Sequence, residues 1–142
     1  MKKIDLVVGA RPNFIKAFPV YRELEKTGQF SLRLINTGQH YDENMADVFF
    51  EQLKMKKPDI NLGIGSGRHG EQTASILDKI EKEFLIKKPD MVMVFGDVNS
   101  TLGAALAAAK LNIRVAHVEA GLRSFDRSMP EEINRILTDQ IS

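Results

Sequence analysis

Four short segments of this sequence combine glycine with side chains that carry charge or form hydrogen bonds. They are residues 9–16 (GARPNFIK), 37–42 (TGQHYD), 96–101 (GDVNST) and 119–124 (EAGLRS). The carboxylates of Asp97 and Glu119 are groups that general acid–base catalysis uses. Arg11 offers a guanidinium that can bind phosphate through two parallel hydrogen bonds. These residue types suit proton transfer and the binding of an anion.

Each polar segment directly follows a short apolar run that is typical of a β-strand. The runs are rich in Val and Ile and cover residues 4–8, 32–36, 91–95 and 113–118. Because the runs are continuously apolar rather than alternating, they indicate strands buried on both faces, as in a parallel sheet. The carboxyl ends of parallel strands share one edge, where ligands of open α/β sheets bind. We therefore expect the four polar segments to meet at that edge.

The stretches between the strands have helical periodicity. Ile76, Ile80 and Phe84, for example, fall on one helical face. Pro19 predicts a kink or a late start in the first helix. Helices are expected around residues 14–21, 45–53, 76–84, 102–111 and 130–142. Strands that alternate with helices predict an α/β fold built on a doubly wound parallel sheet.

Several candidate residues also have ordinary structural explanations. Residues 9–16 form either an anion site at a helix N-terminus or a plain strand–helix turn. Asp97 could serve as a turn or capping residue, and Ser128 to Glu131 fits the S-x-x-E capping box. Arg123 could pair with a carboxylate or meet a phosphate. Glu119 is different, because it follows a strand directly and caps no evident helix.

Asp97 and Glu119 follow two different predicted strands, and they could act together if those strands are neighbours in the sheet. If the strands at residues 91–95 and 113–118 are neighbours, their ends lie about 5 Å apart. The two carboxylates could then serve one substrate.

Composition bounds the remaining possibilities. The chain has 142 residues, a net charge of +1 and no cysteine, which fits one domain without disulfides or thiol catalysis. Its basic residues are scattered, which argues against a nucleic-acid surface. No apolar run approaches the roughly 18 residues of a membrane span, and the N-terminus does not resemble a signal peptide. We therefore expect a cytoplasmic protein that binds neither membranes nor nucleic acid.

The spacing of the histidines argues against a metal site, and the position of the glycine-rich segment relative to the predicted strands argues against an NAD site. His40, His69 and His117 lack metal-ligand spacing, so no metal site is expected. Residues 65–70 (GSGRHG) match the dinucleotide fingerprint by letter. However, the preceding apolar run is interrupted, and Asp90 precedes its strand instead of ending it. We interpret this segment as a mobile glycine-rich loop.

The motifs, in their order and spacing, resemble those of UDP-N-acetylglucosamine 2-epimerases. The pair HVEAGLR at residues 117–123 and PEEINR at residues 130–135 is the most specific part of the resemblance. The resemblance covers the whole chain but only the N-terminal portion of the family, whose members have two Rossmann-like domains arranged as in GT-B glycosyltransferases. It implies that residues 1–142 form the Rossmann-like N-terminal domain, and that the UDP-binding C-terminal domain is absent from this chain.

The resemblance also implies a reaction and its residues. UDP-GlcNAc and UDP-ManNAc interconvert when a base removes the C2 proton, UDP leaves by anti elimination, and UDP then adds back with the proton on the other face. Asp97, Glu119 and Glu131 would be the catalytic carboxylates. Arg11 and Lys16 would contact the phosphates. The further candidates for substrate binding are Gln39, His40, Arg123 and Arg135.

The same resemblance implies that neither a cofactor nor a metal is needed and that the isolated chain is inactive. It implies a homodimer and a role in cell-envelope polysaccharide biosynthesis. Many bacterial members read GTRPEAIK where this chain has GARPNFIK, which leaves the sugar and any allosteric site open. The hydrolysing and non-hydrolysing types also remain open. Two alternatives are half of a GT-B glycosyltransferase and a nucleotide-binding module without catalysis.

Overall fold

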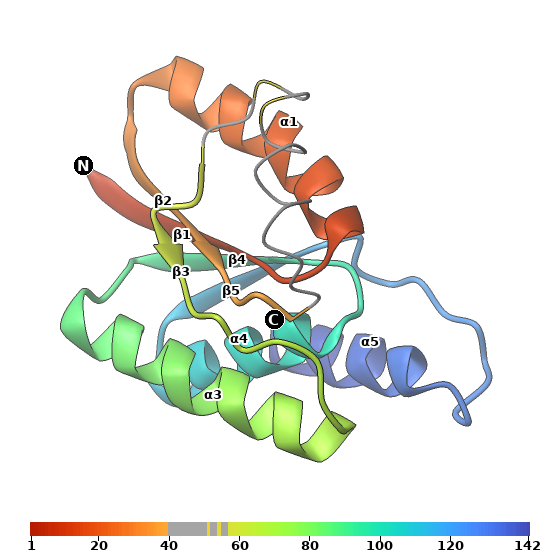
Figure 1. Cartoon of the computed structure of the whole chain (residues 1–142). Helices are drawn as coiled ribbons and strands as arrows, with labels where there is room; N and C mark the ends of the chain where they lie inside the picture. Colours follow the sequence, from red (N-terminus) through yellow and green to blue (C-terminus); the bar gives the residue numbers. More distant parts are fainter. Residues whose placement is uncertain (40–50, 52–53, 55–56) are drawn as a thin grey trace.

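The computed structural model describes residues 1–39, 51, 54 and 57–142 (Figure 1). In chain order the elements are β1 (Lys2–Val8), α1 (Arg11–Thr27), β2 (Phe30–Asn36), β3 (Ile60–Asn61), α3 (His69–Ile86), β4 (Met91–Phe95), α4 (Asn99–Lys110), β5 (Arg114–Val118) and α5 (Pro130–Ile141). The strands form one parallel sheet in the order β3-β2-β1-β4-β5. The predicted α/β class and parallel sheet are confirmed.

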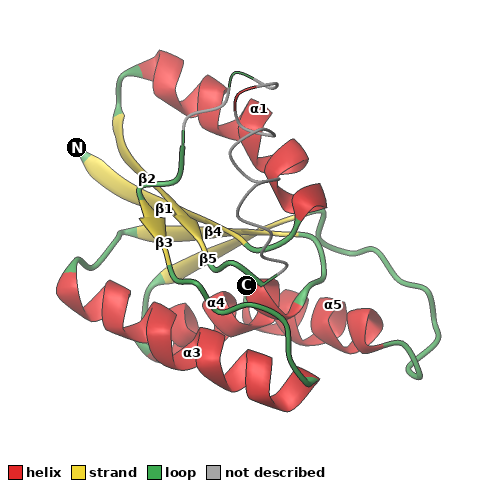
Figure 2. Cartoon of the chain, in the orientation of Figure 1, coloured by secondary structure: helices red, strands yellow, loops and turns green. Residues whose placement is uncertain are grey.

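Helices cover both faces of the sheet, as Figure 2 shows: α1 lies on one face, and α3, α4 and α5 lie on the other. Each face has its own apolar core. Residues of the first core include Leu6, Phe14, Tyr21, Leu34 and Phe95. Residues of the second include Val7, Ile35, Ile80, Phe84, Val94 and Ala108. Leu6 and Val7 enter opposite cores because successive strand side chains point to opposite faces, so a strand buried on both faces is apolar throughout.

β1 lies between β2 and β4 in the sheet. From β1 the chain adds β2 and β3 on one side and then β4 and β5 on the other side, so the order of strand addition changes sides at β1. Such a reversal opens a crevice beyond the carboxyl ends of the strands, where α/β proteins bind ligands. Asn13 ties this region together. Its Oδ1 accepts hydrogen bonds from the backbone N–H groups of Gly9 and Ala10, and its Nδ2 donates to the carbonyl of Phe95. The turn after β1 is thereby joined to the end of β4.

Two local predictions need correction, and a third is not tested. The first helix begins at Arg11 and runs through Pro19, so the predicted late start is wrong. Pro12 lies in the first turn, where a proline is well tolerated because that turn needs no N–H donor from it. The capping box is also wrong, because α5 has Met129 at its N-cap and Ser128 bonds Asp126 instead. The helix predicted at residues 45–53 falls outside the described residues apart from Glu51.

The glycine-rich segment follows β3, a two-residue strand at the edge of the sheet. The backbone N–H of Gly65 donates to the carbonyl of Gly38 at 2.8 Å, which anchors the segment beside the turn after β2. A dinucleotide fingerprint instead needs a full strand leading directly into the glycine turn. Within the described part of the chain, no helix has both the length and the apolarity that crossing a membrane requires.

Candidate active site

The predicted meeting of polar segments occurs at the carboxyl edge of the sheet. β4 and β5 are neighbours, with Phe95 opposite Val118 at their ends. Asp97 and Glu119 therefore follow adjacent strand ends, as the sequence predicted. Gly96 stands between strand and carboxylate with φ of 73°, a left-handed conformation that favours glycine.

Glu119 forms an ion pair across this edge. Its Oε1 lies 2.8 Å from Nζ of Lys16, which α1 contributes, and about a third of each side chain is exposed. A Cβ at Gly96 would make only an ordinary van der Waals contact with the Lys16 nitrogen, at 3.7 Å, so it is the positive φ and not the ion pair that favours glycine there. The cation and the carboxylate thus stand together where a ligand can reach both.

The backbone of Glu119 is in the left-handed region, with φ of 71°. For a residue other than glycine this conformation costs free energy, and it persists only where the surrounding structure enforces it. Such strain clusters at functional sites. It is independent support for the importance of Glu119.

Asp97 binds a second cation. Its Oδ2 lies 2.6 Å from Nη1 of Arg135, and the Nδ2 of Asn134 donates to the Asp97 backbone carbonyl at 2.9 Å. Asp97 does not cap α4, whose N-cap residue is Val98. Asp97 is nevertheless a turn residue, as the other structural alternative predicted, and its carboxylate also forms a long-range pair with Arg135 of α5.

Glu132 is a buried carboxylate that the sequence analysis did not single out. It is 1% exposed, and it accepts hydrogen bonds from Arg135 and from the backbone N–H groups of Ser124 and Phe125. Burial acts to raise the pKa of Glu132, but these hydrogen bonds and the charge of Arg135 outweigh it, so the pKa is lowered. Its signal in the sequence was the three-residue spacing to Arg135, which places the two side chains side by side on a helix.

Glu131 lies in the first turn of α5 and is partly exposed. It is four residues before Arg135, so the two occupy neighbouring positions on one helix face. Since Arg135 contacts Asp97, the start of α5 is brought to the same edge as β4 and β5.

The remaining predicted residues divide by what they contact. Arg123 pairs with Asp139 at 2.7 Å, which confirms the carboxylate alternative for it. Gln39 is buried, and its Oε1 accepts hydrogen bonds from the backbone N–H and hydroxyl of Ser100. Arg11 is exposed at the first position of α1. His40 lies outside the described residues.

A polar network joins three helix N-termini beside the carboxylates. Asn99 donates to Gln72 at 2.8 Å and accepts from Asn134 at 3.1 Å, and it also contacts Nδ1 of His69. A cavity of about 420 Å³ opens here, lined by His69, Gly70, Thr73, Asn99, Ser128, Pro130, Ile133 and Asn134. Because Asn134 also holds Asp97, the cavity adjoins the catalytic candidates.

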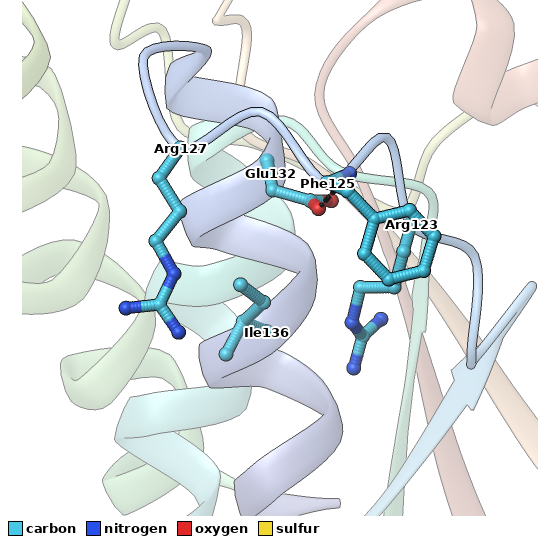
Figure 3. A pocket seen from close by; sticks show the side chains of 5 residues that line it. All are labelled: Arg123, Phe125, Arg127, Glu132 and Ile136. Carbon is cyan, nitrogen blue, oxygen red and sulfur yellow. Dashed lines mark hydrogen bonds between the residues drawn. The ribbon is translucent and has the colours of Figure 1, made fainter.

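A second cavity, of about 480 Å³, lies against α5 and the loop before it. Figure 3 shows its lining, with Arg123 and Arg127 projecting on either side of Ile136. Phe125 and Glu132 complete it. None of the three predicted catalytic carboxylates lines this cavity.

The edge of the sheet can therefore exchange protons and hold an anion. Asp97 and Glu119 supply carboxylates from adjacent strand ends, and Lys16 supplies a cation beside one of them. The N-terminus of α1, with Arg11, adds donors and positive charge suited to phosphate. In the described part of the chain, no cluster of three or more His, Asp or Glu side chains could hold a metal ion.

Comparison with known proteins identifies the family. A family model described as UDP-N-acetylglucosamine 2-epimerase matches residues 22–142. The chain belongs to the UDP-N-acetylglucosamine 2-epimerase family.

Relatives in this family are similar along the whole chain. A UDP-N-acetylglucosamine 2-epimerase of Methanococcus maripaludis is 58% identical over 142 residues, which are 100% of this chain and 38% of the relative. A crystal structure of the Methanocaldococcus jannaschii UDP-GlcNAc 2-epimerase, in complex with UDP-GlcNAc and UDP, matches with a TM-score of 0.94 and 58% identity over 99% of this chain and 38% of that one. A Pseudomonas aeruginosa UDP-2,3-diacetamido-2,3-dideoxy-D-glucuronate 2-epimerase is 54% identical over 99% of this chain and 40% of its own length.

The family resemblance and the Rossmann-like fold expected from the sequence are thus confirmed. The chain spans about two-fifths of the length of these epimerases. The matched part includes every candidate catalytic residue, since Asp97, Glu119 and Glu131 all lie within residues 22–142.

Proposed function

We propose that this chain forms the N-terminal part of the active site of a 2-epimerase that interconverts UDP-GlcNAc and UDP-ManNAc. The observation that carries the proposal is the placement of Asp97 and Glu119 after adjacent strands, with Lys16 2.8 Å from Glu119. Family membership and the complex of the M. jannaschii relative with UDP-GlcNAc support it.

The chemistry requires both kinds of group. The C2 proton of the sugar is weakly acidic, so a carboxylate must remove it while the bond from C1 to UDP breaks on the opposite side. The intermediate is a 2-acetamidoglucal. UDP then adds back to C1, and a carboxylic acid returns a proton to the other face of C2. We assign these proton transfers to Asp97, Glu119 and Glu131.

Positive charge must accompany the departure of UDP, because its diphosphate carries the electrons of the broken bond. We assign the diphosphate to Arg11 and Lys16, at the start of α1. Arg123 and Arg135 pair with Asp139 and Asp97 in this structure, so we propose that they serve the site by holding these carboxylates in place and not by contacting the substrate. Gln39 and His40 follow β2, which lies on the side of β1 opposite to β4. We propose that these two residues contact the substrate there.

We also propose that a second domain outside these 142 residues completes the UDP pocket and supplies a catalytic histidine. The coverage of about two-fifths of the relatives supports this proposal. The 142-residue chain alone is then inactive. The complete enzyme, with both domains, needs neither a cofactor nor a metal. A homodimer, a cytoplasmic location and a role in supplying cell-envelope polysaccharides complete the proposal.

The decisive experiment follows C2 of UDP-GlcNAc by proton NMR in D2O. Two samples are compared: the 142-residue chain, and a chimera in which the chain replaces the matching part of the M. jannaschii enzyme, to which it is 58% identical over 140 residues. We expect deuterium at C2 and a ManNAc product with the chimera only. The chimera carrying Glu119→Gln is the matched control, since it keeps shape and removes the titrating group.

Each other outcome corrects a specific part of the proposal. Exchange by the chain alone would show that this part needs no second domain. A folded chimera that binds UDP-GlcNAc without exchanging C2 would overturn the epimerase assignment. Transfer of the sugar to an acceptor without exchange would favour a glycosyltransferase.

The identity of the sugar is a separate question. The P. aeruginosa relative, at 54% identity, is named for a diacetamido glucuronate substrate, so that nucleotide sugar is the second candidate. Offering both nucleotide sugars to the chimera and comparing kcat/KM decides between them. We expect the acetamidoglucose substrate to be preferred, given two archaeal relatives of 58% identity that are named for it.

A further inference from the structure

Asp139, near the end of α5, gathers three hydrogen-bond donors on one carboxylate. Its Oδ1 accepts from Nδ1 of His117 at 2.5 Å, and its Oδ2 accepts from the backbone N–H of Gly121 at 2.9 Å and from Arg123 at 2.7 Å. The side chain is 15% exposed. Burial acts to raise the pKa of Asp139, but the bonds from Arg123, Gly121 and His117 outweigh it, so the pKa is lowered and the carboxylate stays charged.

His117 connects this carboxylate to the neighbouring strand end. Its side chain is 1% exposed, and its Nε2 lies 2.7 Å from the backbone carbonyl of Gly96. A carbonyl only accepts, so Nε2 carries a proton. Nδ1 faces the carboxylate of Asp139, so the ring bridges Asp139 and Gly96 through both of its nitrogens.

The positions of these contacts along the chain are informative. His117 is two residues before Glu119, and Gly121 is two residues after it. Asp139 thus holds the chain on both sides of the left-handed turn at Glu119, through the His117 side chain before it and the Gly121 backbone N–H after it. Gly96, at the other end of the bridge, directly precedes Asp97. One chain of contacts joins the turns that carry both carboxylates.

From this geometry we propose that Asp139 and His117 are positioning residues, which hold Glu119 and Asp97 at a fixed separation for reaction at one sugar carbon. Neither residue need touch the substrate. The inference rests on the proposed epimerase function. It explains how a strained turn keeps one conformation: three hydrogen bonds to a single carboxylate over-determine it.

Two substitutions of Asp139 distinguish a role in holding the turn by hydrogen bonds from a role that needs the negative charge. Asp139→Ala removes all three bonds. Asp139→Asn can keep them, because its amide oxygen accepts from Gly121 and Arg123 while its amide nitrogen donates to Nδ1 of a singly protonated His117. The matched control is Asp78→Asn, which removes an exposed carboxylate of α3 that pairs with Lys82.

In the chimera, we expect Asp139→Ala to lower kcat about 100-fold, as displacement of a catalytic group by about 1 Å does. KM should change little, because binding contacts are unaltered. Asp139→Asn should retain most of kcat, and Asp78→Asn all of it. Unchanged kcat in Asp139→Ala, or equal losses in the Asn and Ala variants, would overturn the inference.

A spectroscopic arm uses the 142-residue chain itself. In nitrogen-15 NMR spectra of Asp139→Asn, the Gly121 amide signal should stay near its place, because the Asn amide oxygen can accept the same hydrogen bond. In Asp139→Ala the amide signals of Glu119 and Gly121 should shift strongly. Unmoved signals in that variant would overturn the inference whatever the kinetics show. Inactivity of the unsubstituted chimera would instead count against the proposed function.

Discussion

Lys16 Nζ lies 2.8 Å from Glu119 Oε1, so the first helix and the last strand of the sheet meet in an ion pair at the carboxyl edge. In the proposed function, Lys16 serves the diphosphate and Glu119 serves the C2 proton. The pair therefore links the two halves of the reaction. A bound diphosphate would compete with Glu119 for Lys16, so substrate binding alters the surroundings of the catalytic carboxylate.

Replacing Lys16 should affect turnover far more than stability. The pair is one-third exposed, and such surface pairs contribute about 0–1 kcal/mol to folding. Loss of a cation that stabilises developing charge typically costs about 100-fold or more in rate. We therefore expect Lys16→Met in the chimera to lower kcat/KM about 100-fold, with an unchanged urea midpoint. Lys26→Met, which removes an exposed pair with Glu23, is the control. Near-normal kcat/KM in Lys16→Met would contradict the assignment.

The left-handed backbone at Glu119 should lower the stability of the folded chain, although the carboxylate is needed for the proposed reaction. Its left-handed backbone costs about 1–2 kcal/mol for a residue with a Cβ, and glycine is free of that cost. Both Glu119→Gly and Glu119→Gln lose the charge and the activity. However, the Gly variant should be more stable than the Gln variant by roughly 0.5–1 kcal/mol, after allowing for the greater freedom of glycine in the unfolded chain. Urea unfolding of the 142-residue chain measures the difference, and a Gln variant of equal or greater stability would refute the strain.

Gly9 should not tolerate even a methyl group. A Cβ there would stand 2.1 Å from Oγ of Ser100 and 2.7 Å from Oγ1 of Thr37, so the turn after β1 would be forced away from α4. We expect Gly9→Ala to destabilise the fold by about 1–3 kcal/mol or more. Gly70→Ala is the matched control, because a Cβ there meets nothing within 4 Å and alanine favours the helix by up to about 1 kcal/mol. Equal thermal midpoints for the two variants would contradict this packing.

Glu132 should make stability depend on pH in the acidic range. Its pKa in the folded chain lies below its ordinary value of 4.5. A lowered pKa means that the unfolded chain binds the proton more readily, so the contribution is fully present above pH 4.5 and is lost as the pH falls through the folded pKa.

Urea titrations from about pH 6 to about pH 3 should therefore show a falling free energy of unfolding, less steep in Glu132→Gln. Glu71→Gln is the control, because Glu71 is exposed and forms a surface pair with Arg68. Parallel curves for the unsubstituted chain and Glu132→Gln would refute a coupled Glu132.

Local patterns in the sequence were sufficient to predict the parallel sheet and the sheet edge at which the candidate residues meet. Continuous Val- and Ile-rich runs identified β1, β2, β4 and β5 because strands covered on both faces contain few polar positions. β3 was not recognised, since a two-residue edge strand leaves no periodic signal. The predicted capping box at Ser128 does not form, because the backbone N–H and the hydroxyl of Ser128 both donate to the Asp126 carboxylate.

The positions of the candidate carboxylates at the sheet edge were likewise predictable, because Glu119 directly follows its strand and Asp97 follows its strand after one glycine. Their partners were not. The sequence showed only that His117 lacks metal-ligand spacing, whereas in the structure it contacts Asp139 of α5 and Gly96 after β4. Nothing local distinguishes an arginine that binds phosphate from one that holds a carboxylate, as Arg135 does.

The sequence by itself determined the family, the alternation of strands and helices, and the set of residues able to do chemistry. These follow from side-chain type and from short-range periodicity, which the chain carries wherever it folds. Tertiary structure alone decided that Lys16 meets Glu119, that Arg135 meets Asp97, and that Glu119 is strained. Those contacts depend on which strands are neighbours, on their register and on the packing of α5, and each is set by the free energy of burying the two apolar cores together.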